Sequence, residues 1–522
     1  MPLETPVRGS CAADAGRSRN STGIQTRDGS IVNHTFKPAR LAVVVLLVMA
    51  ALELLRRHGT SPGMLWTLAA AGAIFVLVEG FSFYNRTYPQ PAQPDNYELH
   101  TVQFDDLGSL WDPAQAEKVL ERVDTSWQAG NTFVYVFIHG WNHNASPSDP
   151  NLLDFNAKTL AKLCLDLSSD ERKALRAKLT GSEHFRLIGL YVGWRGRSLP
   201  GFLNYATMWW RKSAAERVGE GDASEFIERL QRMYLRANAV TRSPEDSAVK
   251  PMMGLVTIGH SFGGQLLLKS VSRSMEFALA ERATKVADVT QPAANAPATA
   301  VRLPVDSLGD LNILLNPATE AYQFGRIDSL YRQLEFPDTQ TPQLVIFSAD
   351  NDVPREAFFP IARLLTLPFR PSFRDPYQGQ LFGKSLGVLQ AQLTHGMQLA
   401  PDQSDSLANS DYTDQDGDKV RTFDFSDVVR FGGVEMRRLP AVGALAPPIA
   451  NSPVSVVLVH DKIIDGHNGI FIDQFQRFLA AYVAFVEGKR LMIRHERFTA
   501  AAAAKKAGCP GADGAGPPPS AP

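Results

Sequence analysis

The chain has 522 residues, of which 44% are hydrophobic, and its formal net charge is −1. This length is enough for one large folded domain or for two ordinary ones. Because positive and negative charges nearly balance, the composition does not favour a nucleic-acid-binding protein, and we expect no nucleic-acid partner.

The first 85 residues differ in kind from the rest of the chain. Residues 1–38 are polar, basic and rich in Ser, Arg and Gly, so we expect a disordered tail. In residues 39–85 two apolar runs, LAVVVLLVMAALELL and GMLWTLAAAGAIFVLVEGFSFY, flank the short segment RRHGTSP. Since a spanning helix needs about 20 mainly apolar residues, these runs predict a two-helix transmembrane hairpin. The alternative is a cleaved signal peptide followed by a core helix, which the late start of the first run disfavours.

This hairpin also predicts where the rest of the chain lies. Two spans return the chain to the side of the membrane on which it began, and the basic N-terminus favours the cytoplasmic side. We therefore expect a protein of the bacterial inner membrane, anchored in the lipid bilayer, with its catalytic domain in the cytoplasm. Arg56 and Arg57, in the short loop between the runs, work against this orientation.

Beyond a proline-rich linker, residues 86–499 alternate between short apolar runs and helical stretches. The runs are continuous, which is typical of strands covered on both faces. Six of them are candidate strands: 132–141, 185–194, 253–261, 310–318, 342–350 and 454–461. Helical stretches separate several of them, among them 222–237, with Asp222 as a plausible N-cap, and 471–488 near the end. This alternation predicts an α/β fold with a mostly parallel central sheet flanked by helices.

Several segments depart from this alternation. Residues 284–304 are rich in Ala, Pro and Thr and are predicted to be a loop. Residues from about 195 to 250 and from about 360 to 450 are longer than a connection requires, so we predict that they are insertions into the domain. The first contains Trp209 and Trp210 beside two cations, a combination that suits a membrane surface, a lid over an apolar pocket, or ordinary buried packing. Residues 500–522 are mainly Ala, Gly and Pro and are predicted to be a disordered tail.

The segment GHSFG, residues 259–263, points to specific chemistry. It fits the pattern G-x-S-x-G, with His260 at the variable position, and lies between a candidate strand and the helix-forming stretch GQLLLKSV, as that motif requires. Gly259 and Gly263 leave room for a sharp turn that lifts Ser261 clear of the sheet, and the next helix points its N-terminus at developing negative charge. We interpret Ser261 as a nucleophile; the alternative is a βα turn with small residues chosen for packing.

A serine hydroxyl is a weak nucleophile without a base, so a histidine, an orienting acid and oxyanion donors should accompany it. The segments FIHGW and GHSFG, an acid after a strand and a late histidine occur in the chain order nucleophile, acid, base. Over roughly residues 100–490 the chain therefore resembles the α/β-hydrolase superfamily, in its bacterial lipase and serine-esterase part. The resemblance implies that the backbone N–H groups of Trp141 and Phe262 form the oxyanion hole and that His139 is structural.

Two histidines and two aspartates compete for the remaining roles. His467, in the loop DGHNGIF before the last helix, matches the position of the family's base better than His460, at the end of VSVVLVH. The acid should follow the run 342–350, where Asp350 and Asp352 each fit a family pattern. We rank Asp352 first, with Asp350 as the alternative; the other aspartate would cap the next helix.

The resemblance implies a membrane-anchored serine hydrolase that cleaves an ester or related acyl bond through an acyl-enzyme intermediate. We predict no cofactor and no metal. The partner is then an acyl or ester substrate, whose identity the fold does not fix. Three further functions remain open: an acyltransferase with the same triad, a non-catalytic hydrolase-fold module that binds at the membrane, and a structural membrane protein whose tail interacts with partners.

Overall fold

The computed structural model describes most of the chain from residue 87 to residue 506. The described ranges are 87–198, 207–239, 251–290, 308–337, 339–355, 372–373, 375–401, 409–413, 419–423, 428–440 and 451–506, with Asn204, Val305 and parts of 53–73. The predicted tail 1–38 and most of the predicted hairpin 39–85 lie outside the described residues. Within the described ranges, no helix is both long enough and apolar enough to cross a bilayer.

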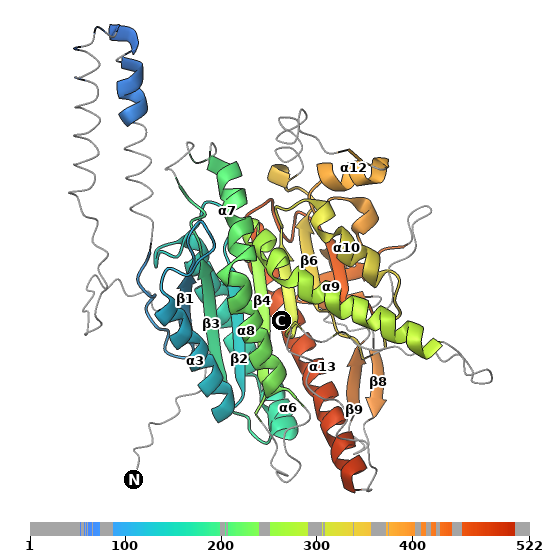
Figure 1. The fold of residues 1–522 in the computed structure, drawn as a ribbon. Coiled ribbons are helices and arrows are strands. Elements are labelled where there is room, and N and C mark those ends of the chain that lie inside the picture. The colour runs from blue at the N-terminus through green and yellow to red at the C-terminus, as the bar shows by residue number, and fades with distance from the viewer. Residues whose placement is uncertain are drawn as a thin grey trace, which may run out of the picture.

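A ten-stranded mixed sheet forms the centre of the fold (Figure 1). Its strands are β1 (Glu98–Gln103), β2 (Thr132–Ile138), β3 (Arg186–Gly193), β4 (Met253–His260), β5 (Leu311–Leu315), β6 (Leu344–Ala349), β7 (His395–Leu399), β10 (Val428–Phe431), β11 (Val434–Arg438) and β12 (Val454–Val459). They are ordered β1-β3-β2-β4-β5-β6-β12-β7-β11-β10. Neighbours from β1 to β7 pair in parallel, whereas β11 and β10 add an antiparallel edge. The prediction of a mostly parallel sheet flanked by helices is confirmed.

Helices cover both faces of this sheet (Figure 1). From residue 87 on, the described helices are α3 (Pro113–Ala129), α4 (Pro150–Asp154), α5 (Ala161–Leu167), α6 (Asp170–Thr180), α7 (Met208–Glu220), α8 (Asp222–Ala237), α9 (Phe262–Thr290), α10 (Ala321–Tyr331), α12 (Pro376–Gly383) and α13 (Asp473–Lys506). One π-helical segment (Phe155–Leu160), two 3-10 turns (Gln390–Gln392, Gly469–Phe471) and a separate ribbon of β8 (Asn409–Thr413) and β9 (Lys419–Phe423) complete the described elements.

The strand β2 shows why its sequence is continuously apolar. Val134, Val136 and Ile138 belong to a core shared with α3, α8 and α9, whereas the intervening Phe133 and Tyr135 belong to a core shared with α5 and α13. Successive side chains of a strand point to opposite faces, so a strand covered on both sides must be apolar at every position. The continuous apolar pattern of residues 132–141 therefore correctly predicts a buried strand.

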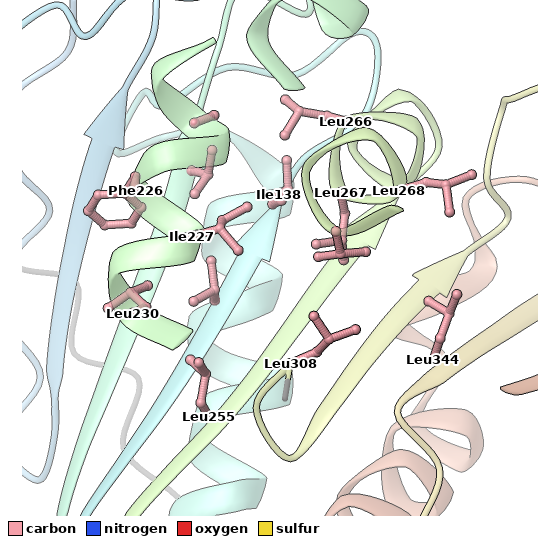
Figure 2. Packing of buried hydrophobic residues seen from close by; sticks show 14 of the residues in the cluster. Ile138, Phe226, Ile227, Leu230, Leu255, Leu266, Leu267, Leu268, Leu308 and Leu344 are labelled. Atoms are coloured by element: carbon pink, nitrogen blue, oxygen red, sulfur yellow. The ribbon is translucent and has the colours of Figure 1, made fainter. Parts of the chain in front are cut away.

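The helix α8 packs apolar side chains against the sheet. Figure 2 shows Phe226, Ile227 and Leu230 of this helix beside Ile138 of β2, and all four side chains are buried. The predicted N-cap is wrong by one position. Gly221 occupies the cap, and Asp222 is the first helical residue; its carboxylate accepts a hydrogen bond at 2.9 Å from the backbone N–H of Leu110 instead.

The segments expected to depart from the βα alternation turn out to be more regular. Helix α9 continues to Thr290, so the predicted loop 284–304 is wrong for its first seven residues. The described part of 195–250 contains α7 and α8, and the segment 360–450 supplies β7, β10 and β11 to the central sheet. Helix α13 continues to Lys506, so the predicted disordered tail 500–522 is wrong for its first seven residues. Its alanine run has the highest intrinsic helix propensity and extends the helix. Residues 507–522 lie outside the described residues.

Candidate active site

Four residues singled out in the sequence lie beyond the carboxyl ends of parallel strands. Trp141 follows β2, Ser261 follows β4, Asp352 follows β6 and His467 follows β12. In the sheet, β2 is adjacent to β4 and β6 is adjacent to β12, with only β5 between β4 and β6. Because parallel strands end at the same edge of a sheet, residues more than 300 positions apart in the chain meet here.

Ser261 occupies a tight turn between β4 and α9. Its φ is +56°, a left-handed value that side chains rarely adopt, and its backbone N–H donates to the carbonyl of Leu315 at 2.9 Å. A Cβ on Gly259 would lie 2.5 Å from the carbonyl oxygen of Gly263, and one on Gly263 would lie 2.2 Å from that of Ile138. Both glycines are therefore needed for the close approach of strand and helix, and this strained turn holds the Ser261 side chain at the helix N-terminus.

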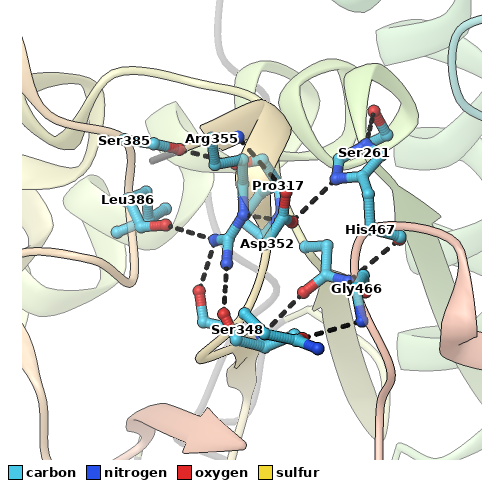
Figure 3. Close-up of polar contacts among 12 residues, drawn as sticks. Ser261, Pro317, Ser348, Asp352, Arg355, Ser385, Leu386, Gly466 and His467 are labelled. Atoms are coloured by element: carbon cyan, nitrogen blue, oxygen red, sulfur yellow. Dashed lines mark hydrogen bonds and ion pairs between the residues drawn. The ribbon is translucent and has the colours of Figure 1, made fainter. Parts of the chain in front are cut away.

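A hydrogen-bonded chain joins Ser261, His467 and Asp352 (Figure 3). His467 Nε2 lies 2.7 Å from Ser261 Oγ, and His467 Nδ1 lies 2.7 Å from Asp352 Oδ2. Among the described residues, no side-chain hydrogen bond joins Asp350 to His467. His460 is also outside the chain, because its Nδ1 lies 2.6 Å from Asp461 Oδ1.

Asp352 is fully buried, and Arg355 provides its counter-charge. The Nε of Arg355 lies 2.5 Å from Asp352 Oδ2, and its backbone N–H donates to Asp352 Oδ1 at 3.2 Å. The same guanidinium also donates to Ser348 Oγ and to the carbonyls of Ala349 and Leu386. Burial acts to raise the pKa of Asp352, but the hydrogen bond from His467 and the Arg355 charge outweigh it and lower the pKa to about 2. Asp352 is therefore an anion at neutral pH.

The loop that carries His467 is fixed by hydrogen bonds to its backbone. Asn316, in a left-handed conformation after β5 (φ +44°), donates from Nδ2 to the carbonyls of Gly466 at 3.1 Å and His467 at 3.0 Å, and its Oδ1 accepts from Ala349 N–H at 2.8 Å. His260 Nε2 lies 3.0 Å from the His467 carbonyl. Because burial, followed by the neighbouring His467, lowers the pKa of His260 to about 3, His260 is a neutral donor here.

His139 is buried and lies outside the hydrogen-bonded chain of Ser261, His467 and Asp352. Its Nε2 accepts from the backbone N–H of Trp194 at 3.1 Å, so its Nδ1, 2.9 Å from the Gly140 carbonyl, is the donor. Its ring stacks on the Trp194 indole with centroids 5.5 Å apart, and burial lowers its pKa to about 4. These contacts fix the turn after β2, where a Cβ on Gly140 would lie 2.7 Å from Ser261 Cβ.

A cavity of about 820 Å³ opens beside this hydrogen-bonded chain. Trp141 and Phe262, the two residues expected to supply oxyanion donors, line it together with Ser261 and His467. Trp209 of α7 lines the cavity as well, whereas the side chain of Trp210 is 68% exposed. The site thus has a substrate-sized space in contact with both the hydroxyl and the imidazole.

The sequence analysis did not identify three sets of residues that hold or line this site. Asn316 binds the His467 loop, and Arg355 binds Asp352. In the cavity wall, His143 Nδ1 lies 3.0 Å from Asp149 Oδ1. Only Arg355, three residues after Asp352, was close enough in the chain to be noticed. The described part of the chain brings together no group of three or more His, Cys, Asp or Glu that could hold a metal ion.

Comparisons with known proteins add little to this geometry. No protein-family model matches the sequence, and no curated protein matches it. One solved structure, of an uncharacterized protein from Pseudomonas aeruginosa, is similar at 10% sequence identity over 49% of this chain and 42% of that chain, with a TM-score of 0.19. The match thus spans less than half of that protein, and a likeness this weak defines neither fold nor function.

Proposed function

We propose that the protein is a serine hydrolase that cleaves an ester or related acyl bond, with the architecture of the α/β-hydrolase superfamily. The observation that carries this proposal is the hydrogen-bonded chain from Ser261 through His467 to Asp352, with two 2.7 Å links. Its geometry matches the needs of an activated serine: a base in contact with the hydroxyl and an anion that orients the base.

The proposed reaction assigns one task to each group. Ser261 Oγ attacks the acyl carbonyl, while His467 Nε2 takes the hydroxyl proton and then passes it to the leaving oxygen. Asp352 holds the imidazole in one tautomer and stabilises the imidazolium. The backbone N–H groups of Trp141 and Phe262 stabilise the oxyanion. Water, activated by His467, then hydrolyses the acyl-enzyme and regenerates Ser261.

Labelling with a fluorophosphonate probe tests the proposal directly. The full-length protein in detergent should be labelled on Ser261, and the Ser261→Ala variant should not. Ser272→Ala is a matched control, because this serine lies on the same helix α9 with its hydroxyl bonded to the carbonyl of Leu268. The control should label like the wild type. Absence of labelling in a protein with a normal thermal unfolding transition would leave the binding-module function in place of the enzyme.

We also propose that residues 39–85 anchor the enzyme in a bacterial inner membrane with the catalytic domain in the cytoplasm. The support is the length of the two apolar runs and the basic segment before them. Fusions of alkaline phosphatase and of a fluorescent protein after residue 90 test the orientation. We expect an active fluorescent protein and an inactive phosphatase, and the reverse pattern would place the domain outside.

A further inference from the structure

In the part of the chain that the structure describes, the wall of the cavity beside Ser261 contains the cationic side chains of Arg197, Lys212 and Arg355. Two of them have carboxylate partners. Lys212 Nζ lies 2.7 Å from Glu216 Oε1 and 3.1 Å from Glu320 Oε1, and Arg355 is paired with Asp352. Arg197 is exposed, and among the residues that the structure describes none forms an ion pair with it. Its charge is therefore available to a molecule in the cavity.

Among the described residues, the carboxylate in the cavity wall is that of Asp149, and it already has hydrogen-bond partners. Its Oδ1 lies 3.0 Å from His143 Nδ1 and accepts from Asn151 N–H at 2.9 Å, while Oδ2 accepts from Asn144 N–H at 3.1 Å. Burial acts to raise the pKa of Asp149, but the hydrogen bond from His143 outweighs it and the pKa is lowered. Asp149 is thus bound in its own loop, and the cavity keeps a net positive character at Arg197.

The backbone beside Arg197 is held in place. The flanking Arg195 and the nearby Arg211 both bind Asp106, and Arg211 Nη1 also donates to the Arg195 carbonyl at 3.0 Å. The side chain of Arg195 is thus held in an ion pair with Asp106, whereas Arg197 lines the cavity. A Cβ on Gly196 would lie 2.6 Å from the Gly140 carbonyl, so this segment packs directly on the turn after β2.

A second set of contacts joins the same two segments. The backbone N–H of Asn142, a residue with φ +73°, donates to the Gly196 carbonyl at 3.1 Å. The buried Asn204 accepts from Ser198 N–H at 3.0 Å and donates to Asn142 Oδ1 at 2.6 Å. A strained asparagine and a buried asparagine therefore position the Arg197 backbone against the turn that also carries Trp141. This is the preorganisation that a recognition residue needs.

We infer that Arg197 binds an anionic group of the substrate, so that the preferred substrates are esters that carry a carboxylate or phosphate. A guanidinium matches either group because its planar fork donates two parallel hydrogen bonds. This inference rests on the proposed esterase function and deepens it by naming the substrate class. Because Arg197 is exposed, salt should weaken the preference.

Matched ester pairs test the inference on the full-length protein. In the first pair, mono-4-nitrophenyl glutarate carries the charge on the acyl side, and 4-nitrophenyl pentanoate is neutral. In the second pair, 4-(pentanoyloxy)benzoate carries the negative charge on the leaving group, and the methyl ester of its benzoate is neutral. The variants are Arg197→Gln, Arg197→Lys and the control Arg273→Gln, which removes the same charge from an exposed site outside the cavity wall.

We expect the wild type to prefer one of the two anionic esters over its neutral partner in kcat/KM. Arg197→Gln should lower kcat/KM for that ester about tenfold or more and change the neutral ester less than about twofold. Arg197→Lys should be intermediate, the control should match the wild type, and 0.5 M salt should reduce the preference about as the glutamine variant does. Equal anionic-to-neutral ratios in wild type and Arg197→Gln would overturn the inference while the proposed function stands.

Failure of the proposed function has a different signature, namely no Ser261-dependent turnover of either neutral ester. Binding is then measured by calorimetry, with 4-(pentanoyloxy)benzoate titrated into Ser261→Ala. The inference predicts binding that Arg197→Gln, in the same Ser261→Ala background, weakens about tenfold. Absence of binding, or equal binding in both proteins, would overturn it.

Discussion

Replacing Asp352 by asparagine removes one negative charge from the centre of the site with little change in shape. Asp352 Oδ2 lies 2.7 Å from His467 Nδ1, and the carboxylate is fully buried. Two unit charges about 4 Å apart interact by about 4 kcal/mol at an effective dielectric constant of about 20. At about 1.4 kcal/mol for each factor of ten, loss of this interaction with the imidazolium lowers kcat about 10³-fold. We therefore expect Asp352→Asn to reduce kcat for a neutral ester by about three orders of magnitude.

Stability must be measured with activity, because Arg355 loses its partner in the same variant. This guanidinium is 2% exposed, and removing one member of a buried ion pair costs about 3–5 kcal/mol. The double variant Asp352→Asn/Arg355→Met removes both charges and should recover much of the free energy of unfolding. It should not recover kcat, because the anion that stabilises the imidazolium is still missing.

Asp350→Asn is the matched control, since both aspartates follow β6 but, of the two, Asp352 is the one that lies within hydrogen-bond distance of His467. The assay is steady-state hydrolysis of 4-nitrophenyl pentanoate, together with urea unfolding of each variant. We expect Asp350→Asn to keep kcat within about threefold, as for a change that does not touch the base. A larger loss in Asp350→Asn, or more than about a tenth of the activity left in Asp352→Asn, would refute this assignment of the acid.

Three further predictions concern the supports of the site. Asn316→Gly keeps the left-handed backbone but removes the hydrogen bonds to the His467 loop. In steady-state kinetics kcat should therefore fall about 10-fold or more while KM stays unchanged. An increase in KM as large as the decrease in kcat would contradict this prediction. Gly263→Ala places a Cβ against the Ile138 carbonyl and should lower the free energy of unfolding by at least about 1–3 kcal/mol, whereas Gly383→Ala, with open space around it, should change the melting temperature little. His139 and His260 have pKa values lowered to about 4 and about 3, so the unfolded chain binds protons that the folded chain does not as the pH falls below about 6.5. Urea midpoints should therefore fall between pH 7 and pH 5. A further loss should follow below about pH 4, where the carboxyl of Asp352 binds a proton in the unfolded chain but stays ionised in the folded one down to a pKa of about 2. A flat profile would exclude neutral buried histidines.

The central part of the fold could be predicted because its strands are buried on both faces. Each of the six candidate runs contains a strand, and the continuous apolar pattern of 132–141 is explained by two cores on opposite sides of β2. Four strands toward the two ends of the strand order were not predicted, among them β1 and β10, which form the edges. β1, β7, β10 and β11 have fewer fully buried positions, and β7, with the pattern buried-intermediate-buried-exposed-exposed, lacks a continuous apolar run. An edge strand is specified by its partner's register, which is a long-range property.

In the candidate site, too, features set by local sequence could be predicted, and features set by long-range contacts could not. The turn 259–263 is local, since a glycine on either side of Ser261 is required by the close approach of β4 and α9 within five residues. The choice between Asp350 and Asp352 was not local. Successive residues after a strand point in different directions, and only the position of the His467 loop, 115 residues further on, decides which carboxylate it meets.

Asn316 shows the limit of sequence reasoning most clearly. It follows β5, the strand between those that precede Ser261 and Asp352, so its amide lies in the gap that the His467 loop must cross. One side chain donates to two carbonyls of that loop and accepts from the end of β6, and so fixes His467 relative to Asp352. Such a residue carries no motif, because its function comes entirely from strand order. We therefore expect the supports of a triad to be found by asking which polar side chains lie at the ends of the strands between its members.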